Sequence, residues 1–286
     1  MKKRLKNKKT IQCIQMSMIA IFCVFMLVLE FVRFNIFEDL FYNQMLLKIL
    51  QQTCGICIVY FLLKRLNIKL FGKPENLLYL LPCFVIALDN FPLCSYLNGN
   101  MQIVRSNPLD VLVFAVYCLF IGLFEEGVFR GLIFGVLLVS FSKDRKGLLK
   151  TYFISSLIFG GAHLFNIFSG GGVGATLLQV CYTILTGGLF AFALLKTKNI
   201  LCCGVIHGLY NFCGLLLSEN GLGTGIVFDI PTVIMMTVIS VIIGVFVLAA
   251  VVKYSDKERL ELYKRFDIKI KKENEENEEY NNTPES

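Results

Sequence analysis

The sequence predicts an all-α polytopic membrane protein with about eight transmembrane helices and both termini in the cytoplasm. Three observations predict it. Of the 286 residues, 56% are hydrophobic and only 17% are charged, whereas soluble domains average about 45–50% and about 25%. The hydrophobic residues form runs of about 20, the length that an α-helix needs to cross a bilayer. The basic residues fall between alternate runs, as the positive-inside rule expects of cytoplasmic segments.

Eight apolar runs are long enough to be spans, and we expect each of them to be one helix. They cover residues 11–34, 44–63, 77–95, 110–140, 151–168, 173–195, 199–217 and 231–252. Residues 1–252 are therefore expected to form a single transmembrane domain. The first run follows a basic segment but continues past 20 residues without a small-x-small cleavage site, so we interpret it as a retained signal anchor.

The distribution of Lys and Arg predicts the orientation independently of hydropathy. Of the 28 basic residues, 24 lie in the N-terminal segment, in the second, fourth and sixth gaps between runs, and in the C-terminal tail. These segments alternate across the membrane, so their side is expected to be cytoplasmic. The net charge of +7 follows from this asymmetry and does not indicate binding to nucleic acid. A chain rich in Lys, Ile and Asn and without Trp favours a bacterial plasma membrane.

Residues 253–286 form a charged cytoplasmic tail with two parts. Residues 253–272 contain eight basic and four acidic residues, and we expect them to continue the last span as a helix beside anionic headgroups. Residues 273–286 are acidic and lack aliphatic side chains, so they are expected to be disordered.

Few ionisable residues lie inside the predicted spans. The stretch FEEGVFRG at 124–131 places two glutamates and an arginine in an apolar run, where an unpaired charge costs about 2.5–3.5 kcal/mol. The chain has only two histidines, His163 and His207, and both lie in predicted spans. A lone histidine in a helix is usually a packing residue, but two beside a Glu-Glu-Arg cluster indicate a function. Asp89 and Glu30 also lie in spans, each isolated in the sequence.

Helix geometry assigns provisional roles to the Glu-Glu-Arg cluster. Glu126 and Arg130 are four residues apart, so they share a helix face and can pair as carboxylate and guanidinium. Glu125 is rotated by about 100° from Glu126, and position 129 is Phe, so no cation follows it one turn later. Glu125 is therefore expected to face a cavity and to act as a general base.

The two histidine segments supply the other groups that amide hydrolysis needs. His207 and Asn211 are four residues apart, and two donors on one face can stabilise the oxyanion of a tetrahedral intermediate. His163 can orient the water that Glu125 deprotonates. Glu125, His163 and His207 also suit a three-ligand site for a divalent metal such as zinc. A metal-free, glutamate-activated water fits the same residues, and we favour it.

Three motifs occur in order on three predicted helices, namely EExxxR at 125–130, FxxxH at 159–163 and HxxxN at 207–211. Together they resemble the CAAX-protease and bacteriocin-processing family of intramembrane endopeptidases, also called CPBP or Abi, over a motif core at 110–217. The resemblance implies proteolysis in or near the membrane. It implies water activation by Glu125 with His163, oxyanion stabilisation by His207 with Asn211, and support from Glu126, Arg130 and Phe159.

Glu125, His163 and His207 can act together only if they lie at a similar depth in the membrane. Counted from the nearest predicted cytoplasmic charge, His207 lies about 14 Å deep and His163 about 20 Å deep. Glu125 precedes Lys143 by 18 residues, about 27 Å along a straight helix. This helix is therefore expected either to tilt or to end well before Lys143.

The sequence predicts an endopeptidase that acts on a membrane-embedded, lipidated or leader-bearing peptide. A bacterial source favours a peptide pheromone, a bacteriocin leader or a surface-protein signal as substrate. A non-catalytic protein of the same fold, which binds peptides and protects a producer from its own bacteriocin, is the alternative. A proton-coupled transporter would show internal repeats and broken helices in corresponding halves, and the sequence shows neither.

Overall fold

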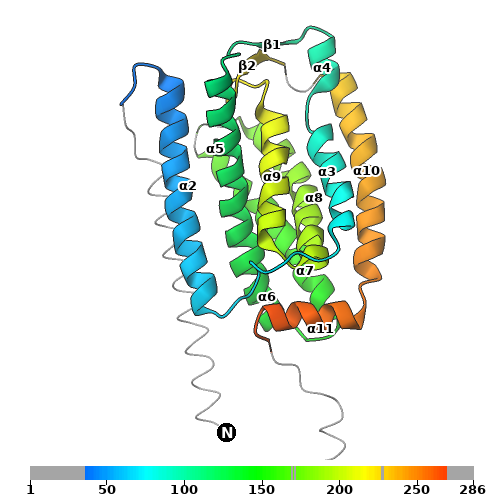
Figure 1. The fold of residues 1–286 in the computed structure, drawn as a ribbon. Helices are drawn as coiled ribbons and strands as arrows, with labels where there is room; N and C mark the ends of the chain where they lie inside the picture. The colour runs from blue at the N-terminus through cyan, green and yellow to red at the C-terminus, as the bar shows by residue number, and fades with distance from the viewer. Residues whose placement is uncertain (1–35, 169, 171, 227–228, 269–286) are drawn as a thin grey trace, which may run out of the picture. The chain divides into compact units, whose positions relative to one another are not determined.

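The computed structural model describes residues 36–168, 170, 172–226 and 229–268 (Figure 1). The predicted span at 11–34 and the acidic segment at 273–286 lie outside the described residues. The helices and strands in the described part are α2 (Leu40–Arg65), η1 (Leu77–Leu80), α3 (Leu81–Asp89), α4 (Leu93–Leu97), β1 (Met101–Ile103), α5 (Pro108–Glu126), η2 (Gly127–Ile133), α6 (Phe134–Ser140), α7 (Arg145–Ala162), η3 (His163–Ile167), α8 (Val173–Thr197), α9 (Ile200–Leu215), β2 (Gly223–Gly225), α10 (Ile230–Val252) and α11 (Asp256–Arg265).

The helical membrane architecture predicted from the sequence is confirmed. In the described residues, six helical segments are long and apolar enough to cross a membrane, and α9 is a shorter apolar helix. These seven coincide with the seven predicted runs between residues 44 and 252. The cytoplasmic placement of both termini stays a prediction.

The charged tail begins with a helix of its own. The sequence analysis expected residues 253–272 to continue the last span, but α10 ends at Val252 and α11 starts at Asp256. Ser255 and Glu258 form a capping box that begins the new helix.

Three of the predicted spans are not uniform α-helices. In the run at 151–168, α7 passes into the 3-10 turn η3. The run at 77–95 is interrupted after Asp89, where Pro92 lacks the N–H that a continuing helix needs. The run at 110–140 is continuous from Pro108 to Ser140 over 33 residues, but its middle, η2, is π-helical. It starts sharply because the Asn107 side chain accepts a hydrogen bond from Leu109 N (3.0 Å) and Pro108 occupies the first turn.

The 33-residue stretch bears on the depth of Glu125. It ends at Ser140, just before Lys143. The expectation that the helix ends well before Lys143 is therefore wrong. At 1.5 Å per residue the stretch is about 50 Å long, longer than a hydrocarbon core of about 30 Å. Glu125 is its eighteenth residue, near the middle of the stretch.

The chain divides into two compact units, and each is built from separate segments. Unit 1 takes its described residues from Met1–Phe61, Phe84–Val128 and Cys203–Ile239, and unit 2 from Leu62–Cys83, Phe129–Cys202 and Ser240–Ser286. The predicted single transmembrane domain at 1–252 stays a prediction.

Unit 1 contains a small sheet that the sequence analysis did not foresee. β1 and β2 pair antiparallel, with Gln102 opposite Thr224. The segment around β2 is glycine-rich, with GLGTG at 221–225. Next to the sheet, Arg105 binds Asp39 (2.7 Å) and lies over the ring of Phe41 (4.6 Å), which ties the segment before α5 to the start of α2.

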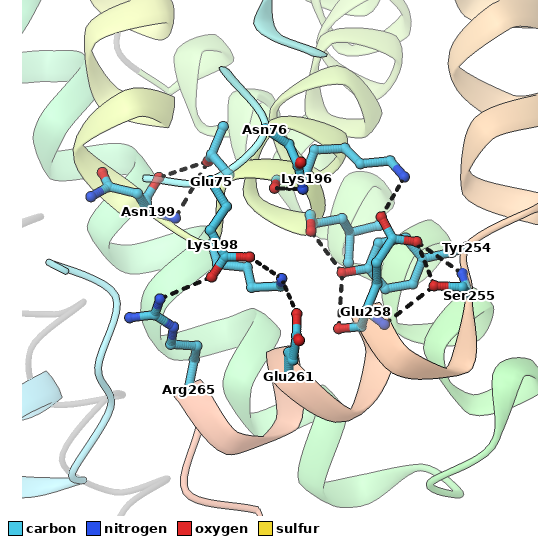
Figure 2. A network of polar contacts seen from close by, with 12 residues as sticks. Glu75, Asn76, Lys196, Lys198, Asn199, Tyr254, Ser255, Glu258, Glu261 and Arg265 are labelled. Atoms are coloured by element: carbon cyan, nitrogen blue, oxygen red, sulfur yellow. Dashed lines mark hydrogen bonds and ion pairs between the residues drawn. The ribbon is translucent and has the colours of Figure 1, made fainter. Parts of the chain in front are cut away.

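Unit 2 is organised around α8, whose C-terminal half is buried. Small residues allow α7 to lie close to α8, since an added Cβ at Gly160 would be 2.9 Å from the backbone nitrogen of Ile184. At the end of α8, Lys198 is 1% exposed and pairs with Glu75 and Glu261 (Figure 2). Backbone hydrogen bonds reinforce this corner, with Ile200 N donating to Leu70 O at 2.9 Å.

Candidate active site

The site in unit 1 begins with a direct contact between the backbones of α5 and α9, which run side by side (Figure 1). An added Cβ at Gly122 would meet the carbonyl oxygen of Gly204 and lie 2.5 Å from the nitrogen of Gly208. In return, an added Cβ at Gly208 would lie 2.8 Å from the Cα of Leu119. Only glycine fits such an approach. It brings α5, one turn before its end, against the part of α9 that carries His207.

His207 lies between the two glutamates of the EExxxR motif. Its Nδ1 is 2.8 Å from Glu126 Oε1, and its Nε2 is 3.7 Å from Glu125 Oε2. Because an ionised carboxylate only accepts hydrogen bonds, Nδ1 is the nitrogen that donates to Glu126. Glu126 is fully buried, whereas the Glu125 side chain is 26% exposed. Glu125 is therefore the carboxylate that water can reach.

This geometry adds a contact that the sequence analysis did not assign. His207 contacts Glu126 as well as Glu125. The expected pairing of Glu126 with Arg130 and the expected action of His207 with Asn211 stay predictions. Asn211 follows one turn later in α9 and is partly exposed. Its role as an oxyanion donor stays a prediction.

Asn90, which directly follows α3, forms a second contact with α9. Its amide donates to the carbonyl oxygen of Tyr210 at 2.8 Å, and an added Cβ at Gly214 would collide with it. Sequence reasoning singled out the neighbouring Asp89 and missed Asn90, for which no local pattern exists. The close approach of α5 and α9 could have been predicted from the sequence, because Gly204 and Gly208 form a GxxxG motif around His207.

In unit 2, the FxxxH motif fixes the ring of His163. α7 ends at Ala162, and His163 begins the 3-10 turn η3. Its Nδ1 is 3.0 Å from the carbonyl oxygen of Phe159, which can only accept, so Nδ1 donates and the neutral imidazole has its lone pair on Nε2. The two rings also meet edge to face at 5.2 Å. His163 therefore presents a hydrogen-bond acceptor, as a residue that orients water requires.

Arg130 also contacts the ring of Phe159. The guanidinium lies 4.4 Å from the centre of the Phe159 ring and donates to Gly187 O at 2.8 Å. Arg130 and Phe159 are each 1% exposed, and a cation over an aromatic face is favourable when both are shielded from water. A side chain at position 187 would crowd this ring, since an added Cβ would lie 3.0 Å from Phe159 Cδ1.

The predicted site residues thus form two groups, one in each unit. Glu125, Glu126, His207 and Asn211 belong to unit 1, and Arg130, Phe159 and His163 belong to unit 2. The chain passes from one unit to the other within the π-helical turn η2, a rare element that is frequent at functional sites. A contact of Glu125 with His163, or of Glu126 with Arg130, stays a prediction.

A metal site was left open by the sequence. Within the part of the chain that the structure describes, no group of three or more His, Cys, Asp or Glu side chains is placed so that it could hold a metal ion. Glu125 and His207 lie in unit 1 and His163 in unit 2, so a metal held by these three residues stays a prediction.

Comparison with known proteins supports the family resemblance. Residues 107–213 match the model of the family described as type II CAAX prenyl endopeptidase Rce1-like. This segment is therefore similar to an Rce1-like CAAX protease domain. No curated protein and no solved structure matches the chain significantly.

The Rce1-like match covers a little over a third of the chain and contains all three motifs. The resemblance to the CAAX-protease and bacteriocin-processing family is thereby confirmed. Rce1-like proteins are proteases. Together with the long apolar helices, the match identifies an integral membrane protein.

Replacing Gly122 with Ala should separate α5 from α9. The added methyl has no space against the backbone of α9, and overpacking of this kind costs about 1–3 kcal/mol. We expect the free energy of unfolding in detergent to fall by that amount. Gly244→Ala is the matched control, because it lies in α10 and an added Cβ meets nothing within 4 Å. An unchanged stability of Gly122→Ala would contradict the contact.

Replacing Glu126 with Leu should change the protonated nitrogen of one histidine only. The chain has two histidines, so the imidazole ¹⁵N NMR spectrum reports both without ambiguity. We expect protonated Nδ1 on both rings in the wild type. In Glu126→Leu, His207 should lose this form while His163, bonded to Phe159 O, keeps it. Glu126→Gln retains an acceptor oxygen and should resemble the wild type. A wild-type His207 without a proton on Nδ1 would rule the assignment out.

Proposed function

We propose that this chain is an intramembrane endopeptidase that hydrolyses one peptide bond of a membrane-embedded, lipidated or leader-bearing peptide. The observation that carries the proposal is the pairing in unit 1, where the partly exposed Glu125 lies beside Nε2 of His207, which Glu126 holds by Nδ1. The Rce1-like match, which includes these residues, supports the same reaction.

In the proposed reaction, Glu125 removes a proton from a water, and the water oxygen attacks the carbonyl carbon of the substrate. Glu125 suits this step because it is the exposed member of the glutamate pair and because a general base must reach its water. His163 orients the water, and its lone pair on Nε2 supports that role. The proton on Glu125 then passes to the leaving amine, and the C–N bond breaks.

The tetrahedral intermediate carries negative charge on the former carbonyl oxygen. We assign its stabilisation to Nε2–H of His207 and the side-chain amide of Asn211, because hydrogen-bond donors that are already oriented toward a developing charge usually accelerate such reactions most. In this role His207 donates from Nε2 to the oxyanion while its Nδ1 stays bonded to Glu126. Glu126 acts through His207 and is a positioning residue.

The proposed substrate follows from the location of the site. Glu125 lies in a helical stretch long and apolar enough to cross a membrane, and His207 lies in a shorter apolar helix. The scissile bond must therefore be brought to the membrane by a lipid or an apolar segment. We propose a bacterial plasma membrane as the location, and a peptide pheromone, a bacteriocin leader or a surface-protein signal as the substrate class.

Glu125→Gln should abolish most of the activity. It removes the base with almost no change in shape, and the loss of a general base lowers the rate by about 100-fold or more. The measurement is cleavage of a library of membrane-anchored peptides by the purified protein in nanodiscs. Glu219→Gln, in an exposed segment of the same unit, is the matched control and should cleave normally.

The outcomes of this experiment separate the candidate functions. Equal cleavage by wild type and Glu125→Gln would mean that Glu125 is not the base. Binding of a peptide by both proteins without any cleavage would instead support the non-catalytic immunity protein. If the wild type cleaves, it is then dialysed against a chelator, and retained activity is expected for a metal-free reaction.

Asn211→Asp should lower kcat rather than raise KM. The change replaces a donor by an acceptor of the same shape, and loss of one oxyanion donor costs about 10²–10³ in kcat. Steady-state kinetics on a cleaved peptide from the library would test it. Asn211 is partly exposed, so the free energy of unfolding should stay within about 0.5 kcal/mol of the wild type. A change in KM alone would assign Asn211 to substrate binding.

A further inference from the structure

Asn90 lies at a break in the apolar run at 77–95. α3 ends at Asp89, and the chain turns there before α4 starts at Leu93. The stretch Leu77–Leu97 as a whole is long and apolar enough to cross a membrane, so this turn lies at membrane depth. Non-helical backbone and polar side chains at that depth lie against other protein or line a water-filled cavity. Asn90 is half-buried, and α9 covers one side of it.

The side-chain amide of Asn90 lies on the same face of α9 as His207 and Asn211. It occupies the space that a side chain at position 214 would fill, since an added Cβ at Gly214 would lie 2.8 Å from Asn90 Cγ. Gly214 follows Asn211 by three residues and His207 by seven, and both spacings return to nearly the same side of a helix. His207, Asn211 and the Asn90 amide therefore form a row along α9.

The amide of Asn90 has hydrogen-bonding groups to spare. Within the described residues, its side chain makes a single hydrogen bond, from Nδ2 to the carbonyl oxygen of Tyr210 at 2.8 Å. An asparagine amide has two N–H groups and an acceptor oxygen, so one N–H and Oδ1 have no partner in this part of the chain. Such a pair is complementary to the N–H and C=O of one residue in an extended peptide, which point to the same side.

We propose that Asn90 is a specificity-determining residue that binds the main chain of the substrate peptide. The inference rests on the proposed function, in which His207 and Asn211 bind the scissile carbonyl group. Along the helix axis, Gly214 is about 10.5 Å beyond His207 and about 4.5 Å beyond Asn211. An extended peptide covers that distance in two or three residues, at about 3.3 Å per residue.

Asn90 thus accepts a hydrogen bond from the N–H of one substrate residue, two or three positions from the scissile bond, and donates one to the C=O of the same residue. A contact of this kind selects an extended main chain whatever the side chain is. It excludes proline at that position, because proline has no N–H.

The test is the binding of peptides to the Glu125→Gln protein in nanodiscs, which does not depend on cleavage. The probes are the tightest-binding peptide of the membrane-anchored library and its analogues, in each of which an ester replaces one peptide bond and removes one N–H. We expect a single ester to weaken binding about fivefold, the effect of losing one hydrogen bond. In a peptide that the wild type cleaves, this ester should lie two or three residues from the cut. If no ester weakens binding, the inference is overturned.

Two variants in the same background link this difference to Asn90. Asn90→Ala removes the amide, and Gly214→Ala displaces it with an added methyl, so in both variants the peptide and its ester should bind equally. Asn98→Ala is the matched control, because it removes the same amide from an exposed position of unit 1 where it bonds Asp229. It should keep the fivefold difference. Weaker binding of every peptide, with the ester difference retained in Asn90→Ala, would show that Asn90 supports α9 and does not contact the substrate.

The results also separate the role of Asn90 from the proposed function. An ester difference that depends on Asn90, without any cleavage by the wild type, would support the main-chain contact and contradict the endopeptidase. Cleavage by the wild type without such a difference would support the endopeptidase and overturn the role of Asn90. Neither binding nor cleavage of any peptide would overturn both.

Discussion

The candidate site depends on the contact between the backbones of α5 and α9. Two helices normally stand 8–10 Å apart because side chains separate them, but Gly122 and Gly208 bring one backbone onto the other. The glutamates follow Gly122 within one turn, and His207 directly precedes Gly208. A hydrogen bond of 2.8 Å between Glu126 and His207 therefore requires no bridging water and no long side chain. The glycines position the chemistry although they take no part in it.

Polar groups in an apolar region are held by contacts that also fix their orientation. Glu126 and the carbonyl oxygen of Phe159 each accept from the Nδ1 of one histidine, so both imidazoles turn Nε2 toward other groups. Arg130 is held between a ring face and a backbone oxygen. The contacts that stabilise these buried groups thus also fix which imidazole nitrogen donates and which way the guanidinium points. Preorganised catalysis requires such fixed orientations.

Sequence patterns predicted the features that are local in the chain. Span lengths and the three motifs depend on hydropathy and on spacing within one helix, and both were recovered. The contact of Glu126 with His207 was missed because the four-residue rule considers one helix at a time, whereas 81 positions separate these residues. The pairing of β1 with β2 was missed for the same reason, since short strands far apart in sequence carry no periodic signal. The π-helical turn η2 also has no pattern of spacing that distinguishes it from an α-helix.

The start of α9 is held in place by Lys198, a buried lysine just before the helix. Lys198 adopts a left-handed conformation (φ 49°), which a residue with a Cβ keeps only when its surroundings hold it there. Its ion pairs with Glu75 and Glu261, and the hydrogen bond from Ile200 N to Leu70 O, supply that restraint. A shift of the helix start by one residue would move His207 by about 1.5 Å and rotate it by about 100°. The buried lysine therefore fixes the residue at which α9 begins, and with it the register of that helix.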